Sequence, residues 1–551
     1  MEIFKIEDGP TYWLPADEQE VIELVRQAKN NNEIICVRGA AHSFPLINTL
    51  EKGRAEGRQY KYVMLSNMFA YKYMGNNTVY VQAGCHIGHD PWDPLKISTP
   101  ENSLVYQLAH PSDPNQPELS IPDLGGITHQ TVGGFLSTSS SGGSTKYSFE
   151  DALISVDIIH YNAGIGEVEK CTFKRPVHDD PTDPFYGAGV ATMGLFGIIV
   201  SATFSCSRGF FIGGEERITT VDNCEIDLFG SGNGVKPSLK EYLKTTIYTR
   251  LIWWPQRNVN KMVVWKARQM TELEANKWAE QAYRKMGKMP PFPPVKKYEE
   301  VIYILNSPVL AVLASGVIFS FIGTWPKWLR DLLGNTTKYR FIKKNVEKNF
   351  YPHILPRLLD LIVPLDTVEN RNKGPQQFSD TWYSGLPMDN QISDKLMPVW
   401  FTELWIPIDQ SENVMKELYA FYTESDENTR AFSCEIYAAK KSRFWLSPAY
   451  GTDVIRIDIF WFGKNLCDPV LFFQKFWNLL SKYNFRPHWG KYLPDSLKIY
   501  PDPHDITGAD YLKAVYPSQQ WQAWMELREK MDAPQIFVND YWRSHLGIKP
   551  V

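Results

Sequence analysis

Two segments of the 551-residue sequence hold residue types that could bind a cofactor. The first is CVRGAAHSFP, residues 36–45, in which an apolar, strand-like run ends in a turn of small residues that contains His42. The second is the segment 121–144, where glycines are interleaved with serines and threonines and no lysine or arginine occurs. Glycine lets the backbone approach a ligand and turn its N–H groups inward, and hydroxyl groups add donors without bulk. This composition predicts a backbone cradle for a pyrophosphate, with a plain stack of small-residue turns as the alternative.

Neither segment matches a common nucleotide-binding motif. The segment 121–144 lacks the GKS or GKT of a P-loop, and its glycine spacing differs from the Rossmann fingerprint. CHIGHD brings His86, His89 and Asp90 together and could suggest a metal site. That segment follows a strand and opens a loop without a further cluster of ligands, so a satisfied polar loop is favoured and no metal is predicted.

The elements around His42 follow an α+β pattern. Residues 16–32 have apolar positions at helical spacing and end in an asparagine cluster, which predicts a helix. EIICVRGAAHS, KYVMLSNM and NTVYVQAGC predict strands that end in turns, where ligands often bind. The segment 91–122 is rich in proline, serine and aspartate and predicts a long irregular loop.

Further along the chain, LISVDIIHYN and GLFGIIVSATF predict strands, and the glycine clusters stop near residue 210, which marks a plausible domain boundary. The region from there to about residue 485 mixes predicted strands with long helices such as ENVMKELYAFYTE. PSQQWQAWMELREKM predicts one more helix near the C-terminus.

The composition indicates an ordinary globular protein with 43% hydrophobic and 22% charged residues. A net charge of −4 argues against a nucleic-acid binder, and 18 tryptophans favour large cores and an apolar ligand cavity. Seven scattered cysteines without a CxxC pair, and an N-terminus without a secretory apolar core, predict a reduced, cytoplasmic protein.

Residues 301–325 form an uncharged stretch about long enough to span a bilayer, interrupted by Asn306, Pro308 and Gly316. A buried helix of the middle domain is the favoured interpretation. A membrane-surface element, which would make the protein membrane-associated, and a true span stay open as alternatives.

Three motifs in order resemble the FAD-binding domain of the vanillyl-alcohol oxidase family, the PCMH type: VRGAAHS, GGITHQTVGGFLSTSSSGGS and GLFGIIVSATF. The later FTELWIPID, WLSPAYG and RPHWGK look like its aldonolactone and alditol oxidase branch. The resemblance covers residues 15–210 and about 397–551, whereas residues 215–395 match nothing that we can place.

The resemblance implies an α+β fold. A two-subdomain, PCMH-type FAD-binding domain would be joined by a cap or substrate domain with a large antiparallel sheet flanked by helices. The implied domains are 1–212 for FAD, 213–485 for the cap, and a C-terminal segment, 486–551, that returns to the FAD domain.

Carried over by position, the resemblance implies that His42 is bonded covalently to the 8α-methyl carbon of FAD. Because no cysteine occurs in 121–144, a single covalent link is predicted. The residues that the resemblance places at the cofactor are Arg38, Gly39, Ala40, Ala41, His42, Ser43, Gly125, Thr131, Val132, Gly133, Gly134, Ser137, Thr138, Gly142, Ile198 and Ile199.

Catalytic residues are implied near the C-terminus. Oxidation of an alcohol needs an acceptor for the hydroxyl proton and positive charge near flavin N1 and C2=O. Lys491 in RPHWGK matches the branch's lysine, and His488 lies close before it. Glu435 in CEIYAAKK resembles the glutamate of the branch's Glu-x-Arg pair.

Tyr437 stands where that pair has its arginine, which bears on the substrate. An arginine pairs with a polyhydroxylated or lactone substrate, whereas tyrosine offers one hydroxyl and an apolar face. Lys440 or Lys441 would be the compensating cation. RPHWGK therefore favours a sugar, alditol or lactone, whereas Tyr437 and the many tryptophans favour an apolar alcohol such as a sterol or terpenoid.

The sequence thus predicts a FAD-dependent oxidase acting on CH–OH donors, with hydride passing to flavin N5 and oxygen becoming hydrogen peroxide. Its predicted partner is a small-molecule substrate and not a nucleic acid. The alternatives are a dehydrogenase with another electron acceptor, a flavin-dependent oxidative cyclase of secondary metabolism, and a non-catalytic membrane-associated binding protein on the same fold.

Overall fold

The computed structural model describes most of the chain. The described residues are 1–6, 9–44, 54–55, 57–256, 260–278, 345, 376–387, 399–429, 432–462, 468–500 and 503–551. The apolar stretch 301–325 lies outside them, so its interpretations stay predictions. No helix in the described ranges combines the length and the apolar character that crossing a membrane requires.

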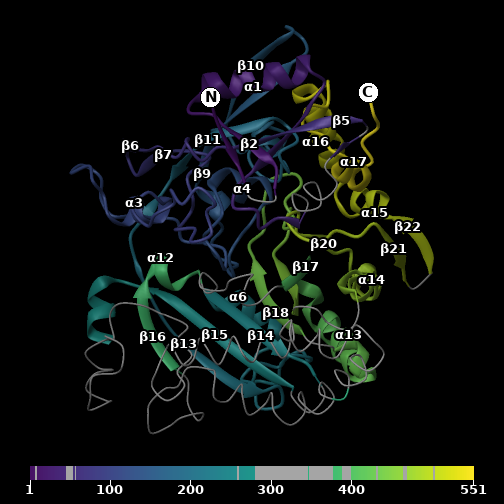
Figure 1. Ribbon diagram of the computed structural model, residues 1–551. Coiled ribbons are helices and arrows are strands. Elements are labelled where there is room, and N and C mark those ends of the chain that lie inside the picture. Colours follow the sequence, from purple (N-terminus) through teal and green to yellow (C-terminus); the bar gives the residue numbers. More distant parts are fainter. Residues whose placement is uncertain are drawn as a thin grey trace.

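The N-terminal part of the chain holds two five-stranded sheets (Figure 1). The first, ordered β1-β2-β5-β3 with β4 beside β5, consists of β1 (Glu2–Lys5), β2 (Thr11–Leu14), β3 (Ile34–Arg38), β4 (Arg54–Ala55) and β5 (Arg58–Met64). The second, ordered β10-β9-β11-β7-β6, consists of β6 (Tyr71–Gly75), β7 (Thr78–Gln82), β9 (Leu153–Asn162), β10 (Glu167–Lys174) and β11 (Ile198–Ser205). As the sequence predicts, β3 ends directly before the turn that contains His42.

The helix predicted at residues 16–32 is α1 (Glu18–Asn30). Asp17 caps it by accepting a hydrogen bond from the Glu20 N–H at 2.9 Å, and the Glu20 carboxylate accepts one from the Ala16 N–H at 2.9 Å. The apolar face of α1 is buried against β9 and β10 at helical spacing. This packing fixes where β3 starts and therefore where the His42 turn lies.

The large sheet is fully antiparallel and has eight strands in the order β16-β13-β15-β14-β18-β19-β17-β20. Its strands are β13 (Phe211–Thr220), β14 (Tyr248–Trp254), β15 (Lys261–Met270), β16 (Gln376–Thr381), β17 (Val399–Pro407), β18 (Phe432–Ala439), β19 (Val454–Phe462) and β20 (Arg486–Pro487). The predicted fold class, an α+β protein with a large antiparallel sheet flanked by helices, is confirmed.

Strand alternation gives this sheet one apolar face and one charged face. On β17, β18 and β19, residues such as Leu404, Ile436 and Ile457 are buried in a core cluster shared with helices. The helices of that cluster are α6 (Leu239–Thr245), α13 (Ser411–Glu424) and α14 (Pro469–Leu480). The residues in between, among them Glu403 and Asp458, belong to the opposite face and line a cavity.

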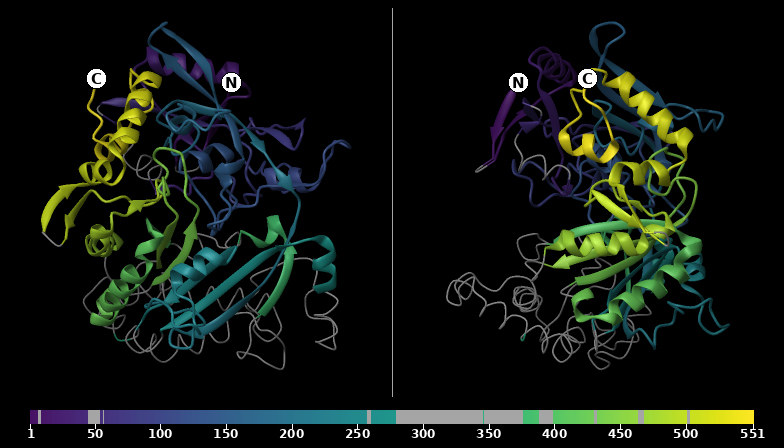
Figure 2. Two further views of the ribbon diagram at one scale, coloured as in Figure 1. Left: turned by 180° about the vertical axis from the view of Figure 1, so that it is seen from behind. Right: turned by 90° about the vertical axis from the view of Figure 1, so that its right-hand side faces the viewer.

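The C-terminal helices return to the N-terminal sheets, and both chain ends lie at the same end of the molecule (Figures 1 and 2). The Ile35 N–H donates to the Ile536 carbonyl at 2.8 Å, and the Arg58 guanidinium donates to the Gln535 carbonyl at 2.9 Å. These helices are α15 (Gly508–Val515), α16 (Ser518–Met531) and α17 (Asp540–Leu546), which follow the hairpin β21 (Ser496–Ile499) and β22 (His504–Thr507). The domain limits proposed above stay predictions.

The irregular loop predicted at 91–122 is wrong in part. It contains the helix α3 (Leu104–Ala109) and the strand β8 (Leu119–Ser120), and β8 pairs with β12 (Ser207–Arg208). These elements are too short to raise a periodic signal above the surrounding prolines and aspartates. Sequence patterns set no bounds for three more short helices: α4 (Val132–Ser137), α5 (Phe185–Ala188) and α12 (Trp382–Gly385).

Two adjacent residues of α14 test the orientation of this helix against the sheet. Phe472 is 4% exposed and its ring centroid lies 4.9 Å from that of Trp461, whereas Leu471 is 65% exposed. We expect Phe472→Ala to lower the free energy of unfolding by about 3–5 kcal/mol because it empties a packed core position. Leu471→Ala should change it by less than about 0.5 kcal/mol. Similar losses for both variants in urea unfolding would contradict this packing.

Candidate active site

A cavity of about 580 Å³ lies among the His42 turn, the Gly/Ser/Thr segment and the charged face of the large sheet. This volume is within the range of small-molecule and cofactor sites. All the predicted catalytic residues, namely Glu435, Tyr437, His488 and Lys491, line it. All the predicted cofactor-binding residues line it too, except Val132. The structure therefore brings together residues from both ends of the sequence, while their roles stay predictions.

The His42 turn presents backbone donors to the cavity. Ala41 adopts a left-handed conformation with φ of 62°, which reverses the chain directly before His42. Within the described residues, the N–H groups of Ala40, Ala41 and Ser43 donate to no protein acceptor, and all three residues line the cavity. Consecutive N–H groups of this kind bind anions. The turn is suited to a diphosphate.

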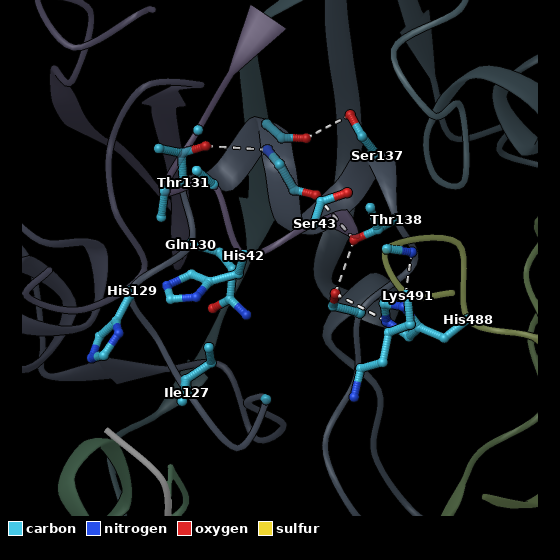
Figure 3. Close-up of a pocket in the computed structure, with 18 of the residues that line it drawn as sticks. His42, Ser43, Ile127, His129, Gln130, Thr131, Ser137, Thr138, His488 and Lys491 are labelled. Carbon is cyan, nitrogen blue, oxygen red and sulfur yellow. Dashed lines mark hydrogen bonds between the residues drawn. The ribbon is translucent and has the colours of Figure 1, made fainter. Parts of the chain in front are cut away.

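His42 itself is exposed within the cavity and lies beside His129, with the ring centroids 5.5 Å apart (Figure 3). In Figure 3 these two imidazoles stand on one side of the view, and Lys491 and His488 stand on the other. His129 is buried, and its carbonyl accepts a hydrogen bond from the Nδ1 of His86. The imidazole of His42 therefore lines the same cavity as the charged wall of the large sheet.

Within the cradle predicted at 121–144, three N–H groups are used inside the protein. The Val132 N–H donates to the Cys85 carbonyl at 2.8 Å, and the Gly133 N–H donates to the Ala83 carbonyl at 2.9 Å. Thr131 caps α4 by accepting a hydrogen bond from the Gly134 N–H at 3.2 Å. These N–H groups are therefore used inside the protein, and Val132 is fully buried beneath the cavity. Two backbone carbonyls and the helix cap of Thr131 thus take donors that the composition assigned to a ligand.

The hydroxyl groups of this segment remain able to accept hydrogen bonds. Ser137 donates to the Gly133 carbonyl at 2.7 Å, and Thr138 donates to the Gly134 carbonyl at 3.1 Å. Both oxygens keep lone pairs on the cavity wall. Thus α4 offers acceptors for a hydroxyl-rich chain, while the His42 turn offers donors for an anion.

Some of the glycines are required by chain packing. A Cβ on Gly142 would lie 2.3 Å from the Leu124 carbonyl oxygen, and one on Gly143 would lie 2.6 Å from the Thr249 carbonyl oxygen. Asp123 holds this loop by accepting hydrogen bonds from the Ser141 hydroxyl at 2.9 Å and the Gly142 N–H at 3.0 Å. The segment is therefore partly the stack of small-residue turns that was the alternative.

The opposite wall carries a row of three carboxylates. Asp458 on β19 is the register partner of Glu403 on β17 and of Glu435 on β18, so the three lie side by side across the sheet. Asp458 and Glu403 are each 1% exposed, and Glu435 is 5% exposed. Buried carboxylates are costly unless cations accompany them. We call these three residues the carboxylate row.

Three cations accompany the carboxylate row. The Arg456 Nε lies 2.6 Å from a Glu403 oxygen, and the Arg250 Nε lies 3.2 Å from a Glu435 oxygen. The Lys491 ammonium bridges Glu403, at 3.1 Å, and Asp458. The charges of these six groups balance, which explains how the sheet tolerates them in its interior.

Arg456 supplies the guanidinium that the sequence lacks at position 437. It is the register partner of Tyr437, donates to the Tyr437 hydroxyl at 2.7 Å, and stacks over its ring at 3.9 Å. Lys440, one of the two expected compensating cations, instead pairs with Asp151, and Lys441 is exposed. Neither lines the cavity, so that expectation is wrong. The guanidinium comes from the neighbouring strand.

The protonation states follow from these contacts. Burial opposes ionisation of Glu403, but Arg456 and Lys491 hold the pKa of this carboxyl below its ordinary value. Burial raises the pKa of Asp458 to about 7, with Glu403 adding to the shift and Lys491 opposing it. Burial also lowers the pKa of His488 to about 3. The ring is therefore neutral, and since its Nδ1 accepts from the Gly490 N–H at 3.0 Å, its Nε2 carries the proton.

The fit to FAD rests on three observations. The His42 turn offers N–H donors for the diphosphate, α4 offers hydroxyl acceptors, and Lys491 supplies a positive charge at the far wall. In the CHIGHD segment, for which no metal was predicted, the His86 Nδ1 forms a hydrogen bond with the His129 carbonyl at 2.5 Å. The residues present therefore suit the flavin dinucleotide that the sequence predicted.

Sequence reasoning missed Arg250, Glu403, Arg456 and Asp458. The alternation of isoleucines with Arg456 and Asp458 in IRIDIF was a usable signal, because it predicts a strand with one apolar and one charged face. Pairing the row required the register of β17, β18 and β19, which the sequence alone does not provide.

Comparisons with known families and curated proteins show which proteins this chain is similar to. A family model described as D-arabinono-1,4-lactone oxidase matches residues 323–545. The chain is 29% identical over 116 residues to L-gulono-1,4-lactone dehydrogenase of Mycobacterium tuberculosis, and 28% identical over 162 residues to D-arabinono-1,4-lactone oxidase of Saccharomyces cerevisiae. These matches cover 21% and 28% of this chain, and 23% and 26% of those relatives.

Comparison with solved structures shows the fold. Cholesterol oxidase from B. sterolicum superposes with a TM-score of 0.64 at 14% identity, covering 97% of this chain and 94% of that one. Chitooligosaccharide oxidase superposes with a TM-score of 0.56 at 12% identity, covering 98% and 92%. The fold is that of the PCMH-type flavin oxidases. The matches point to the lactone-oxidase branch and not to vanillyl-alcohol oxidase in particular.

Arg456 and Arg443 form a matched pair for testing the charge balance of the site. Arg456→Met leaves Glu403 without its guanidinium in a buried position, and we expect it to lower the free energy of unfolding by about 3–5 kcal/mol. Arg443 pairs with Asp179 on the surface, with both side chains more than half exposed, so Arg443→Met should cost less than about 1 kcal/mol. Equal losses in chemical denaturation would contradict the role of Arg456.

Proposed function

We propose that the protein is a FAD-dependent oxidoreductase that oxidises a CH–OH group of a sugar-derived lactone or a related polyol. One observation carries the proposal: a single cavity joins the donor-rich His42 turn to a charge-balanced wall that contains Lys491. The match to the lactone-oxidase family model and the lactone substrates in the relatives' names support this substrate class.

FAD, when bound, supplies the acceptor for the hydride that leaves the substrate carbon. The turn at Ala40, Ala41 and Ser43 would hold its diphosphate, and His42 would bond covalently to its ring system. Lys491 would place positive charge beside the group that becomes anionic on reduction. The neutral His488, whose Nε2 lies 3.4 Å from the Ser140 hydroxyl, would orient polar groups at the same wall.

The cavity wall also bears on the choice between polar and apolar substrates. The carboxylate row and its cations present both acceptors and donors, as a polyhydroxylated ring or a lactone requires. Trp400, Phe401 and Phe460 also line the cavity and would pack against the apolar face of such a ring. The same aromatic residues favour a second candidate substrate, an apolar alcohol.

Acid precipitation of the purified protein tests the covalent link. The wild-type precipitate should stay yellow, because a covalent bond through His42 survives unfolding. His42→Ala should release all the colour into the supernatant. His110→Ala, an exposed histidine outside the cavity lining, is the matched control and should keep the colour. An acid-stable flavin in His42→Ala would overturn the attachment site.

Anaerobic reduction followed by a pulse of oxygen tests the reaction. L-gulono-1,4-lactone and D-arabinono-1,4-lactone should bleach the flavin absorbance, and cholesterol should not, because the carboxylate row is matched to polar groups. We expect oxygen to restore the absorbance rapidly with one hydrogen peroxide formed per flavin. Slow reoxidation would instead assign a dehydrogenase, and bleaching by cholesterol alone would reverse the substrate assignment.

A further inference from the structure

The three members of the carboxylate row differ in their partners. Glu403 has the most: Arg456 at 2.6 Å, Lys491 at 3.1 Å and the Tyr437 hydroxyl at 3.3 Å. A carboxylate with a guanidinium, an ammonium and a phenol around it is held in its ionised form. Glu403 is therefore fixed as an anion and is unsuited to take up a proton.

Glu435 occupies the opposite end of the row and has a guanidinium partner of its own. The Arg250 Nε lies 3.2 Å from a Glu435 oxygen, and both side chains are nearly fully buried. An arginine does not lose its proton in a protein, so this pair also keeps its charges. Glu435 is therefore less suited to take up a proton than its place in the CEIYAAKK motif suggested.

Asp458, in the middle of the row, lacks an arginine partner among the described residues. One of its oxygens is paired with the Lys491 ammonium, and its Oδ1 has no hydrogen-bond partner in the described part of the chain. It stands between two carboxylates that stay ionised, Glu403 and Glu435. Protonation of Asp458 would remove its repulsion with both neighbours. Asp458 is therefore the member of the carboxylate row that takes up a proton most readily.

Lys491 connects Asp458 to the open part of the cavity. Both residues line the cavity, but the Lys491 side chain is 22% exposed whereas that of Asp458 is 1% exposed. The ammonium also lies 4.6 Å above the ring of Phe401, which restricts its position. A substrate hydroxyl at this wall would therefore meet Lys491 first.

We propose that Asp458 is the final acceptor of the substrate's hydroxyl proton and receives it through Lys491. This inference rests on the proposed function. The substrate O–H bond breaks and its proton joins the lysine nitrogen as that nitrogen gives one of its own protons to Asp458. The lysine thus ends with the charge it began with, and Asp458 ends neutral. FAD, when bound, would be the oxidant and would take up the two electrons of the substrate C–H bond as hydride.

The charges that face Asp458 define its pH dependence. They are Glu403 on β17, Glu435 on β18, Arg456 on its own strand and Lys491 after β20. Asp458 must be ionised to accept the proton, and burial together with Glu403 raises the pKa of this carboxyl to about 7. The rate should therefore rise with pH through about 7 and level off above it.

Asp458→Asn tests the relay with L-gulono-1,4-lactone as the probe. We expect the anaerobic rate of flavin reduction to fall about 100-fold or more and to lose its rise near pH 7. Acid-stable flavin content should be unchanged. Asp458→Glu, which keeps a carboxylate one methylene further out, should fold and recover the rise with pH. A full rate and an unchanged pH profile in Asp458→Asn would overturn the proposal.

Glu150→Gln is the matched control. Burial raises the pKa of Glu150 to about 7 as well, but this residue does not line the cavity. Its substitution should therefore leave the pH profile of flavin reduction intact. Loss of the rise near pH 7 in Glu150→Gln would show that the profile reports a buried carboxyl elsewhere, and would overturn the assignment to Asp458.

Infrared titration gives a readout that needs no substrate. The wild-type holoprotein should show a carboxylic-acid C=O band that disappears as the pH rises through about 7, and Asp458→Asn should lack that component while Glu150→Gln retains it. If the wild type oxidises no lactone but Asp458→Asn loses a component of this band, the proposed function fails and the proton site stands. If Asp458→Asn keeps every titrating band, the proton site fails whatever the substrate is.

Discussion

The site depends on the balance of charge across three neighbouring strands of the large sheet. Placing Glu403, Asp458 and Glu435 side by side in the interior would be prohibitively costly without nearby cations. Arg456, Arg250 and Lys491 provide them from β19, β14 and the segment after β20. Because these cations come from distant parts of the sequence, the wall forms only when the sheet has its full register. The charged groups of this wall can therefore act together only in the fully assembled sheet.

The same alternation that exposes these charges to the cavity buries the core on the other face. Each apolar residue of β17, β18 and β19 that packs on α13 and α14 sets the side on which its charged neighbour stands. A shift of one residue in register would turn the carboxylates into the helix-packed core and the isoleucines into the cavity. The helices thus fix which face of these strands lines the cavity.

The sequence predicted the elements near His42 well and the opposite wall poorly, for a physical reason. The helix at 18–30, the strand ending at Arg38 and the turn after it are local, and caps, periodicity and small residues define them. The surroundings of Arg456 and Asp458 depend on their cross-strand partners, which the sequence does not specify. In the cradle predicted at 121–144, the glycine composition indicated free N–H donors. The carbonyls of Cys85 and Ala83 accept hydrogen bonds from two of these N–H groups, a contact between distant segments that composition does not reveal.

The position of Arg456 explains how Tyr437 fits into the charged wall of the cavity. Since Arg456 lies across from Tyr437 in register, its guanidinium reaches the phenol and donates to it at 2.7 Å. The phenol in turn donates to Glu403 at 3.3 Å. Glu403 gains two partners by this arrangement and stays ionised, which leaves Asp458 as the member of the row able to change its charge. Polar recognition and proton uptake are thereby divided between adjacent carboxylates, an arrangement that a lone Glu-x-Arg pair on one strand would not provide.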